Sequence, residues 1–173
     1  MIDKIKFILI ATTLLILTSC GSKKQVAFFP TSEVTYQDYS GDILTLRVLG
    51  YGANENSAIE DAQRRAMETL FFRGIPNSSI SKPLIGYNEN ELKQSNNSYF
   101  QEFFGYKRFL TFISETSFIG GQKQKVIATK LNKKKGPKED MVDALVVAVD
   151  VLINVKPLRK DLEQKNVIRK FGF

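Results

Sequence analysis

The segment 43-ILTLRVLGYGANENSAIEDAQRRAMETLFFRGIP-76 decides the fold, because its apolar side chains change from a two-residue to a four-residue period. Residues 43–49 alternate in polarity and predict a strand, with one face formed by Leu44, Leu46 and Val48. Small or apolar residues then recur at every fourth position: Ala58, Ala62, Ala66 and Leu70. This spacing predicts a helix with a flat face that can lie close on a sheet.

The same segment carries signals for both ends of the helix. Asn54 or Asn56 can cap its first turn, because an asparagine side chain accepts hydrogen bonds from the unpaired amides there. Gly74 is typical of a helix stop, and Pro76 prevents continuation. The helix is therefore expected to end close to residue 73.

The rest of the chain predicts further elements beyond a long connection at 75–90. These are a second helix at 91–104, strands at 107–118, 122–131 and 144–153, and a last helix at 158–167. Ile119-Gly120-Gly121 is typical of a tight hairpin between the first two of these strands. The nearly continuous apolar run at 144–153 indicates a central strand. We therefore expect an α+β domain with a mostly antiparallel four-stranded sheet, packed by an alanine-rich helix, with a second helix and a C-terminal helix.

The N-terminus has the three parts of an export signal. Lys4 and Lys6 precede an apolar run at 7–17, which is too short to cross a hydrocarbon core that needs about 20 residues. The run ends in Leu17-Thr18-Ser19-Cys20, which resembles the lipobox of bacterial lipoproteins. The resemblance implies that the Cys20 thiol receives a diacylglyceryl group, that the signal is cut before it, and that the new amino group is acylated. An ordinary signal peptide that ends in cysteine is the alternative.

The lipobox divides the chain into three parts. We expect residues 1–19 to be a removed signal peptide, residues 20–41 a lipidated N-terminus and tether, and residues 42–173 a single α+β domain. Gly21 stands where an aspartate marks inner-membrane retention in well-studied lipoproteins, and residues 22–24 lack the acidic cluster that resembles a surface-export tag. We therefore expect a lipid-anchored outer-membrane protein on the periplasmic face.

Composition argues against most enzyme chemistry. The chain has no histidine and a single cysteine, Cys20. Without histidine, a Ser-His-Asp arrangement is excluded. If Cys20 carries lipid, the chain has no free thiol for a nucleophile or for a thiolate metal site. We expect no enzymatic activity, no metal and no cofactor. A carboxylate-dependent enzyme built on Asp140, Asp143 and Asp150 is the remote alternative.

Three features allow both a structural and a functional interpretation. Asp150 interrupts the most apolar predicted strand, where a carboxylate needs a partner; a structural ion pair or an edge position is the alternative to a functional acid. Gly50-Tyr51-Gly52 lacks the third glycine of a dinucleotide-binding loop, which favours a turn. The aromatic cluster at 99–106 has helical spacing, which favours core over a ligand pocket or an exposed partner patch.

The strongest basic patch is a lysine run in the loop before the last predicted strand. It consists of Lys133, Lys134, Lys135 and Lys138. The whole chain has a formal charge of +7, and removal of Lys4, Lys6 and Asp3 with the signal leaves +6. An exported lipoprotein meets anionic headgroups, lipopolysaccharide or peptidoglycan rather than nucleic acid, so these are the anionic partners considered. A solvated loop is the structural alternative.

A second resemblance concerns the domain. The strand followed by Gly50-Tyr51-Gly52, with the alanine-spaced helix that ends in 70–76, resembles small outer-membrane lipoproteins of unknown activity. More distantly it resembles flagellum-associated small lipoproteins and the N-terminal domain of the flagellar T-ring protein. The last segments of the chain, 158–163 and 168–173, resemble the C-terminal end of proteins in such a family. The resemblance implies a strand, a packed alanine-rich helix and an antiparallel sheet, and supplies no functional residues.

Together these observations predict a lipid-anchored, non-catalytic envelope protein. Its expected role is that of a scaffold or accessory subunit of a periplasmic or outer-membrane assembly, with a protein partner in the envelope. The alternative is a module that binds an anionic envelope polymer, peptidoglycan or lipopolysaccharide, through the lysines of 133–138 with Arg47 or Arg108.

Overall fold

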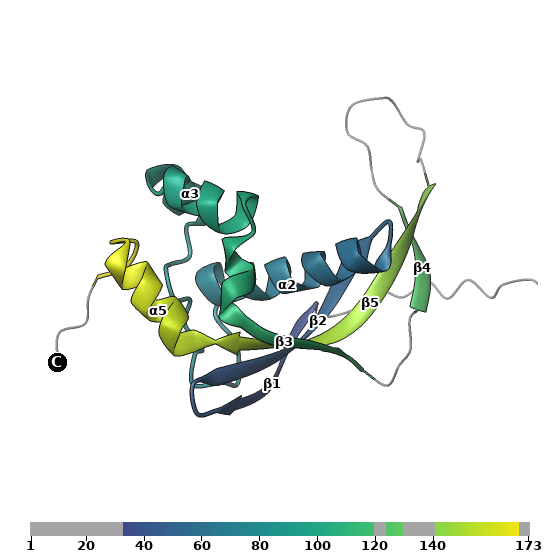
Figure 1. Cartoon of the computed structure of the whole chain (residues 1–173), viewed down its shortest axis with the longest axis horizontal. Coiled ribbons are helices and arrows are strands. Elements are labelled where there is room, and N and C mark those ends of the chain that lie inside the picture. The colour runs from purple at the N-terminus through teal and green to yellow at the C-terminus, as the bar shows by residue number, and fades with distance from the viewer. Residues whose placement is uncertain (1–32, 120–123, 130–140, 170–173) are drawn as a thin grey trace, which may run out of the picture.

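The computed structural model describes residues 33–119, 124–129 and 141–169. Its strands are β1 (Val34–Ser40), β2 (Ile43–Gly52), β3 (Ile113–Phe118), β4 (Gln124–Thr129) and β5 (Met141–Asn154). They form one antiparallel sheet in the order β1-β2-β5-β3, and β4 also pairs with β5. The helices gather on one face of this curved sheet (Figure 1). The α+β class expected from the sequence is confirmed.

Two strands that lie far apart in the chain form the centre of the sheet. β2 and β5 pair from Ile43 opposite Asn154 to Gly52 opposite Leu145. The side chains that point from these strands toward the helices are almost completely buried: Leu44, Leu46, Val48, Val147, Val149, Val151 and Ile153. The alternation at 43–49 and the central position of the last strand are therefore confirmed.

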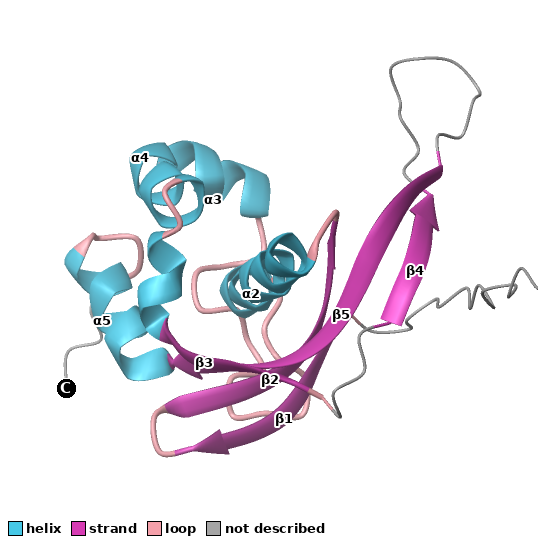
Figure 2. Cartoon of the chain, turned by 45° about the vertical axis from the view of Figure 1, so that its right-hand side comes forward, coloured by secondary structure: helices cyan, strands magenta, loops and turns pink. Residues whose placement is uncertain are grey.

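The alanine-rich helix α2 (Glu55–Phe72) lies in the concave side of the sheet (Figure 2). Asn54 caps it, because its side chain accepts a hydrogen bond from the Ser57 amide at 3.0 Å, and the Ser57 hydroxyl accepts one from the Asn54 amide at 3.1 Å. A Cβ atom on Gly50 would lie 1.9 Å from the carbonyl oxygen of Ala58, and one on Gly52 would lie 2.3 Å from the Ser57 hydroxyl. These glycines belong to β2 and permit close packing of helix on strand, rather than forming a turn or a nucleotide loop.

The helical region predicted at 91–104 is present but broken into three pieces. It divides into α3 (Glu89–Ser95), α4 (Asn97–Phe100) and a π-helical turn, η1 (Gln101–Gly105). The break occurs at Asn96, whose backbone angles of −118° and 36° are not helical. Phe71 of α2 packs on Phe103 of η1 with ring centroids 5.0 Å apart, and this contact joins the two helical regions. The interpretation of the aromatic cluster as core is confirmed except for Tyr106, which is 76 % exposed.

The predicted hairpin pairing between the strands at 107–118 and 122–131 is wrong, and its turn residues Gly120 and Gly121 lie outside the described residues. The predicted strand at 107–118 begins as a 3₁₀ helix, η2 (Arg108–Phe112), and continues as β3. β3 and β4 do not pair with each other; both pair with β5, at 149–153 and at 141–146, and so lie end to end along one edge. The long β5 supplies the partner for both strands.

Strand β1 occupies residues 34–40, inside the segment that the sequence assigned to the tether. It pairs with β2 from Val34 opposite Val48 to Ser40 opposite Ile43, and the register shifts between Tyr36 and Asp38. This irregularity interrupts the alternation by which a strand is recognised in a sequence. The last helix, α5 (Val155–Gln164), follows β5 directly and buries Leu158 and Leu162.

We predict that Gly50→Ala destabilises the domain strongly. The new Cβ atom would collide with the backbone of α2, so helix and strand must separate, at a cost of about 3 kcal/mol or more in the free energy of unfolding. Urea unfolding followed by circular dichroism measures this change. Gly105→Ala is the matched control, because its Cβ atom would lie 3.6 Å from Gln101 Cγ, an ordinary contact. Equal stability of the two variants would contradict the close-packing argument.

Candidate functional site

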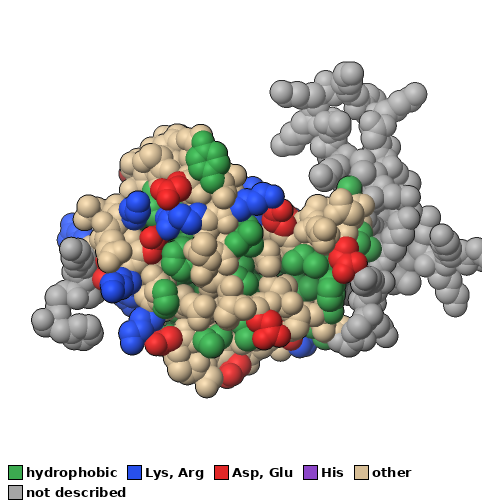
Figure 3. Space-filling view, in the orientation of Figure 1, with side chains coloured by type: hydrophobic (Ala, Val, Ile, Leu, Met, Phe, Trp, Pro, Cys, Tyr) green, Lys and Arg blue, Asp and Glu red, His purple; other side chains and the backbone are tan. Residues whose placement is uncertain are grey.

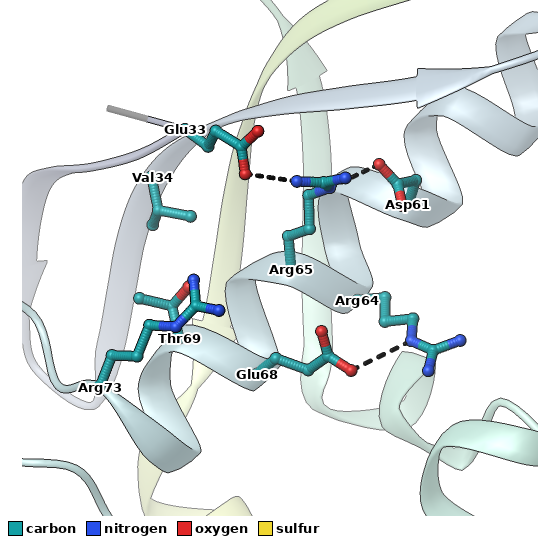
Figure 4. A pocket seen from close by; sticks show the side chains of 8 residues that line it. All are labelled: Glu33, Val34, Asp61, Arg64, Arg65, Glu68, Thr69 and Arg73. Carbon is teal, nitrogen blue, oxygen red and sulfur yellow. Dashed lines mark hydrogen bonds and ion pairs between the residues drawn. The ribbon is translucent and has the colours of Figure 1, made fainter. Parts of the chain in front are cut away.

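A pocket of about 320 Å³ opens between the start of β1 and the outer side of α2 (Figure 4). We call it the arginine pocket, and it is lined by Glu33, Val34, Asp61, Arg64, Arg65, Glu68, Thr69 and Arg73. Three of these side chains are cationic and three are anionic. All except Glu33 and Val34 come from α2 or from the residue that follows it.

The pocket follows one side of α2. Asp61, Arg65, Thr69 and Arg73 recur at every fourth position, and residues four apart are neighbours on a helix surface. Arg64 and Glu68 form a parallel pair with the same spacing. This spacing is the sequence signal for the pocket, although a solvated helix face has the same pattern. The wall formed by Glu33 and Val34 has no comparable signal, because it depends on the pairing of β1 with β2.

Two carboxylates hold Arg65 in place. Its Nε donates to Asp61 Oδ2 at 2.6 Å, and its Nη1 pairs with Glu33. Asp61 Oδ2 also accepts a hydrogen bond from the Tyr51 amide at 3.0 Å, which links the pair to β2. The guanidinium lies 5.0 Å from the centre of the Tyr51 ring. Burial and the nearby Glu33 carboxylate raise the pKa of the Tyr51 phenol.

A second group of charges surrounds Glu68. Arg64 Nε and Lys93 Nζ both donate to its Oε1 atom, at 3.3 and 3.4 Å, and Lys93 also donates to Glu89 at 2.7 Å. The other carboxylate oxygen, Oε2, has no hydrogen-bond donor among the residues that the structure describes. Glu68 therefore retains one oxygen that is available to a ligand.

Arg73 is the remaining cation of the pocket. Its side chain is exposed and makes no hydrogen bond or ion pair within the described part of the chain. Arg73 lies one helical turn beyond Thr69, on the side of α2 that faces the pocket (Figure 4). The pocket thus combines charges that are fixed by their partners with one guanidinium and one carboxylate oxygen that are not.

A smaller depression of about 230 Å³ adjoins the arginine pocket. It is lined by Arg64, Lys93, Phe100, Phe104 and Gly105, so Arg64 belongs to both. Lys93 Nζ lies 5.5 Å from the centre of the Phe104 ring, and the Arg64 guanidinium lies 5.6 Å from the same ring. These cation–π contacts place positive charge beside an apolar surface.

The site residues expected from the sequence have different outcomes. Cys20 and the lysines Lys133, Lys134, Lys135 and Lys138 lie outside the described residues. Asp150 is half-buried and forms a bidentate pair with Arg47 on β2, with both N–O distances at 3.0 Å. This pair joins the two central strands, as the structural interpretation of Asp150 expects.

A further polar cluster connects α5 to the aromatic layer. Asp161 accepts two hydrogen bonds from Arg108, at 2.8 and 3.1 Å, and one from the Tyr99 hydroxyl at 2.9 Å. The Arg108 guanidinium also lies 5.2 Å from the centre of the Tyr99 ring. Burial, followed by the hydrogen bond to Asp161, raises the pKa of the Tyr99 phenol well above its usual range. Asp161, Arg108 and Tyr99 thus bind one another, and this cluster has a structural role: it holds α5 against the aromatic layer.

The face of the molecule shown in Figure 3 has no large area of a single charge among the described residues. Cationic and anionic side chains lie next to one another over the helical part of the molecule (Figure 3). Within residues 33–119, 124–129 and 141–169, no group of three or more acidic, histidine or cysteine side chains is arranged to hold a metal. None of the helices in these ranges combines the length and the apolar character needed to cross a bilayer. Comparisons with protein-family models, curated proteins and solved structures find no match.

We predict that Tyr99→Phe changes the response of the protein to alkali. Because folding raises the pKa of Tyr99, its contribution to stability is complete below the unfolded pKa and is lost as pH rises above about 10. The variant should be less stable at pH 8, by about 1 kcal/mol for the missing hydrogen bond, and should lose less stability between pH 9.5 and 11. Urea midpoints across this range measure both effects, and Tyr87→Phe, at a side chain that is 73 % exposed, is the control. Parallel profiles for the wild type and Tyr99→Phe would disprove the assignment.

Proposed function

We propose that this chain is a lipid-anchored, non-catalytic protein of the bacterial outer membrane that serves as a scaffold or accessory subunit of an envelope assembly. The observation that carries the proposal is Leu17-Thr18-Ser19-Cys20 at the end of an apolar run. Three acyl chains on one residue would hold the protein on the membrane, because each buried methylene contributes about 0.8 kcal/mol. The domain would then act from a fixed place on the periplasmic face.

The position of the domain supports this proposal. Glu33 stands thirteen positions after Cys20 in the chain, and β1 begins at the next residue. Thirteen residues span at most about 45 Å when fully extended. A lipid on Cys20 would therefore keep the sheet and α2 close to the membrane surface, where envelope assemblies form.

The charged residues of the domain also favour a structural role. Asp150 is paired with Arg47, and Asp161 with Arg108 and Tyr99. Carboxylates that act as general acids or bases need access to a substrate, whereas these are held by partners within the domain. Arg47 and Arg108, which were considered for binding of an anionic polymer, are the partners in these pairs. The polymer-binding alternative therefore depends on the lysines of 133–138.

We predict that Cys20→Ser releases the protein from the membrane without unfolding the domain. The thiol is the acceptor of the diacylglyceryl group in the lipobox interpretation, whereas the folded domain begins beyond it. Membrane fractionation and metabolic labelling with palmitate measure anchoring, and circular dichroism measures folding. Ser19→Ala is the control, since it keeps a small residue before the cysteine. An unlabelled wild type, or a Cys20→Ser variant that stays on the outer membrane, would contradict the anchor.

We predict that a photo-reactive phenylalanine analogue at Tyr87 or Tyr106 captures a specific envelope protein in intact cells. These aromatic side chains are 73 % and 76 % exposed, so an aromatic replacement leaves the core undisturbed. Lys156, an exposed position on α5, receives the same analogue as a control. The scaffold role expects a product at one aromatic position that is absent at Lys156. No product, or the same products at all three positions, would count against it.

A further inference from the structure

The arginine pocket contains two groups without a partner among the described residues, the Arg73 guanidinium and the Oε2 atom of Glu68. We propose that the pocket binds the zwitterionic phosphoethanolamine headgroup of a membrane lipid, with its phosphate on Arg73 and its ammonium on Glu68. The chemistry of recognition rests on the pocket alone. The choice of a lipid as the source of this headgroup rests on the proposed anchoring at Cys20.

The charge balance of the pocket points to a zwitterion. Arg64, Arg65 and Arg73 face three carboxylates, those of Glu33, Asp61 and Glu68, so the lining is neutral overall. A purely anionic ligand would gain from the arginines but would also meet these acids at close range. A ligand with one negative and one positive group satisfies both signs. Arginine is suited to the phosphate because its planar fork can donate two parallel hydrogen bonds.

The two unused groups line the same pocket (Figure 4). Glu68 and Arg73 are five positions apart in α2 and its C-terminal cap, which corresponds to about 7.5 Å along the helix axis. A ligand that contacts both groups must therefore carry its two charges at separate ends. Arg65 is fixed by Asp61 and Glu33, so the centre of the pocket is organised before a ligand arrives.

The proposed anchor would keep the pocket near the lipid headgroups of the membrane. Glu33 forms one wall and stands thirteen positions after Cys20, so it lies within about 45 Å of the proposed lipid. Headgroups of the surrounding bilayer are therefore present at high effective concentration, and a weak intrinsic affinity is sufficient for occupancy. The adjoining depression, with Phe100 and Phe104, offers apolar surface for the glycerol and the first methylenes.

The recognition chemistry is tested by titration of the full chain, purified in a maltoside detergent, with three water-soluble probes. These are glycerophosphoethanolamine, glycerophosphoglycerol and inorganic phosphate, and isothermal titration calorimetry measures each affinity. Glycerophosphoethanolamine should bind about tenfold more tightly than either of the others. Equal affinity for the three probes, or no binding of glycerophosphoethanolamine, would overturn the proposal.

Two variants separate the roles of the two groups. Arg73→Gln should weaken binding of glycerophosphoethanolamine about tenfold, as expected for loss of a charge-assisted contact to phosphate. Glu68→Gln should weaken it too, but should strengthen binding of glycerophosphoglycerol, because Arg64 and Lys93 lose their shared carboxylate. Arg169→Gln, at an exposed arginine far along the chain, should change neither. Changes of the same sign for both probes in Glu68→Gln would contradict contact with the ammonium.

The lipid source is tested in cells with a photo-reactive residue in place of Val34, which lines the pocket, and with Tyr87 as the control position. Mass spectrometry of the intact protein should show an adduct with the mass of a phosphatidylethanolamine at position 34 only. An adduct with the soluble headgroup, or with a phosphatidylglycerol, would refute the lipid assignment. The titrations need no anchor, so their failure rejects the pocket chemistry alone, and failure of Cys20→Ser to release the protein rejects the anchor alone.

Discussion

The contact between α2 and β2 determines the geometry of the whole domain. Gly50 and Gly52 remove the side chains that would otherwise hold the helix away from the strand, and Ala58 and Ala62 present an equally flat surface in return. The backbone of β2 can then lie directly against the backbone and small side chains of α2, where close packing gives many dispersion contacts. The aromatic layer and α5 pack around this centre, because Phe71 at the end of α2 reaches Phe103.

The same contact sets the positions of the charges. Asp61 accepts a hydrogen bond from the Tyr51 amide while it pairs with Arg65, so the helix and the strand share one carboxylate. Any shift of α2 along β2 would break this arrangement and would move the arginine pocket away from Glu33. The pocket is thus a product of helix packing, and its charges are spaced by the helix repeat rather than by a loop.

Local features of the fold could be predicted from the sequence, and non-local ones could not. Short sequence patterns predict the strand at 43–49 and a helix cap at Asn54 or Asn56; the strand is confirmed, and the structure has the cap at Asn54. The hairpin pairing across 119–121 was predicted wrongly because two glycines are a local turn signal, whereas the partner of both strands is β5. The partner of Asp150 needed the register of β2 against β5, and the wall of the pocket needed β1. No pattern within a few residues contains that information.

The central strands of the sheet impose an order on folding. Arg47 and Asp150 lie 103 positions apart in the chain, yet they face each other across β2 and β5. Contacts of such long range form slowly, because the intervening chain must close a large loop first. The central β2–β5 pairing therefore cannot form until β5 has emerged from the ribosome. For the export that we propose for this chain, the delay is an advantage, because an incomplete sheet favours the unfolded state in which a polypeptide crosses a membrane.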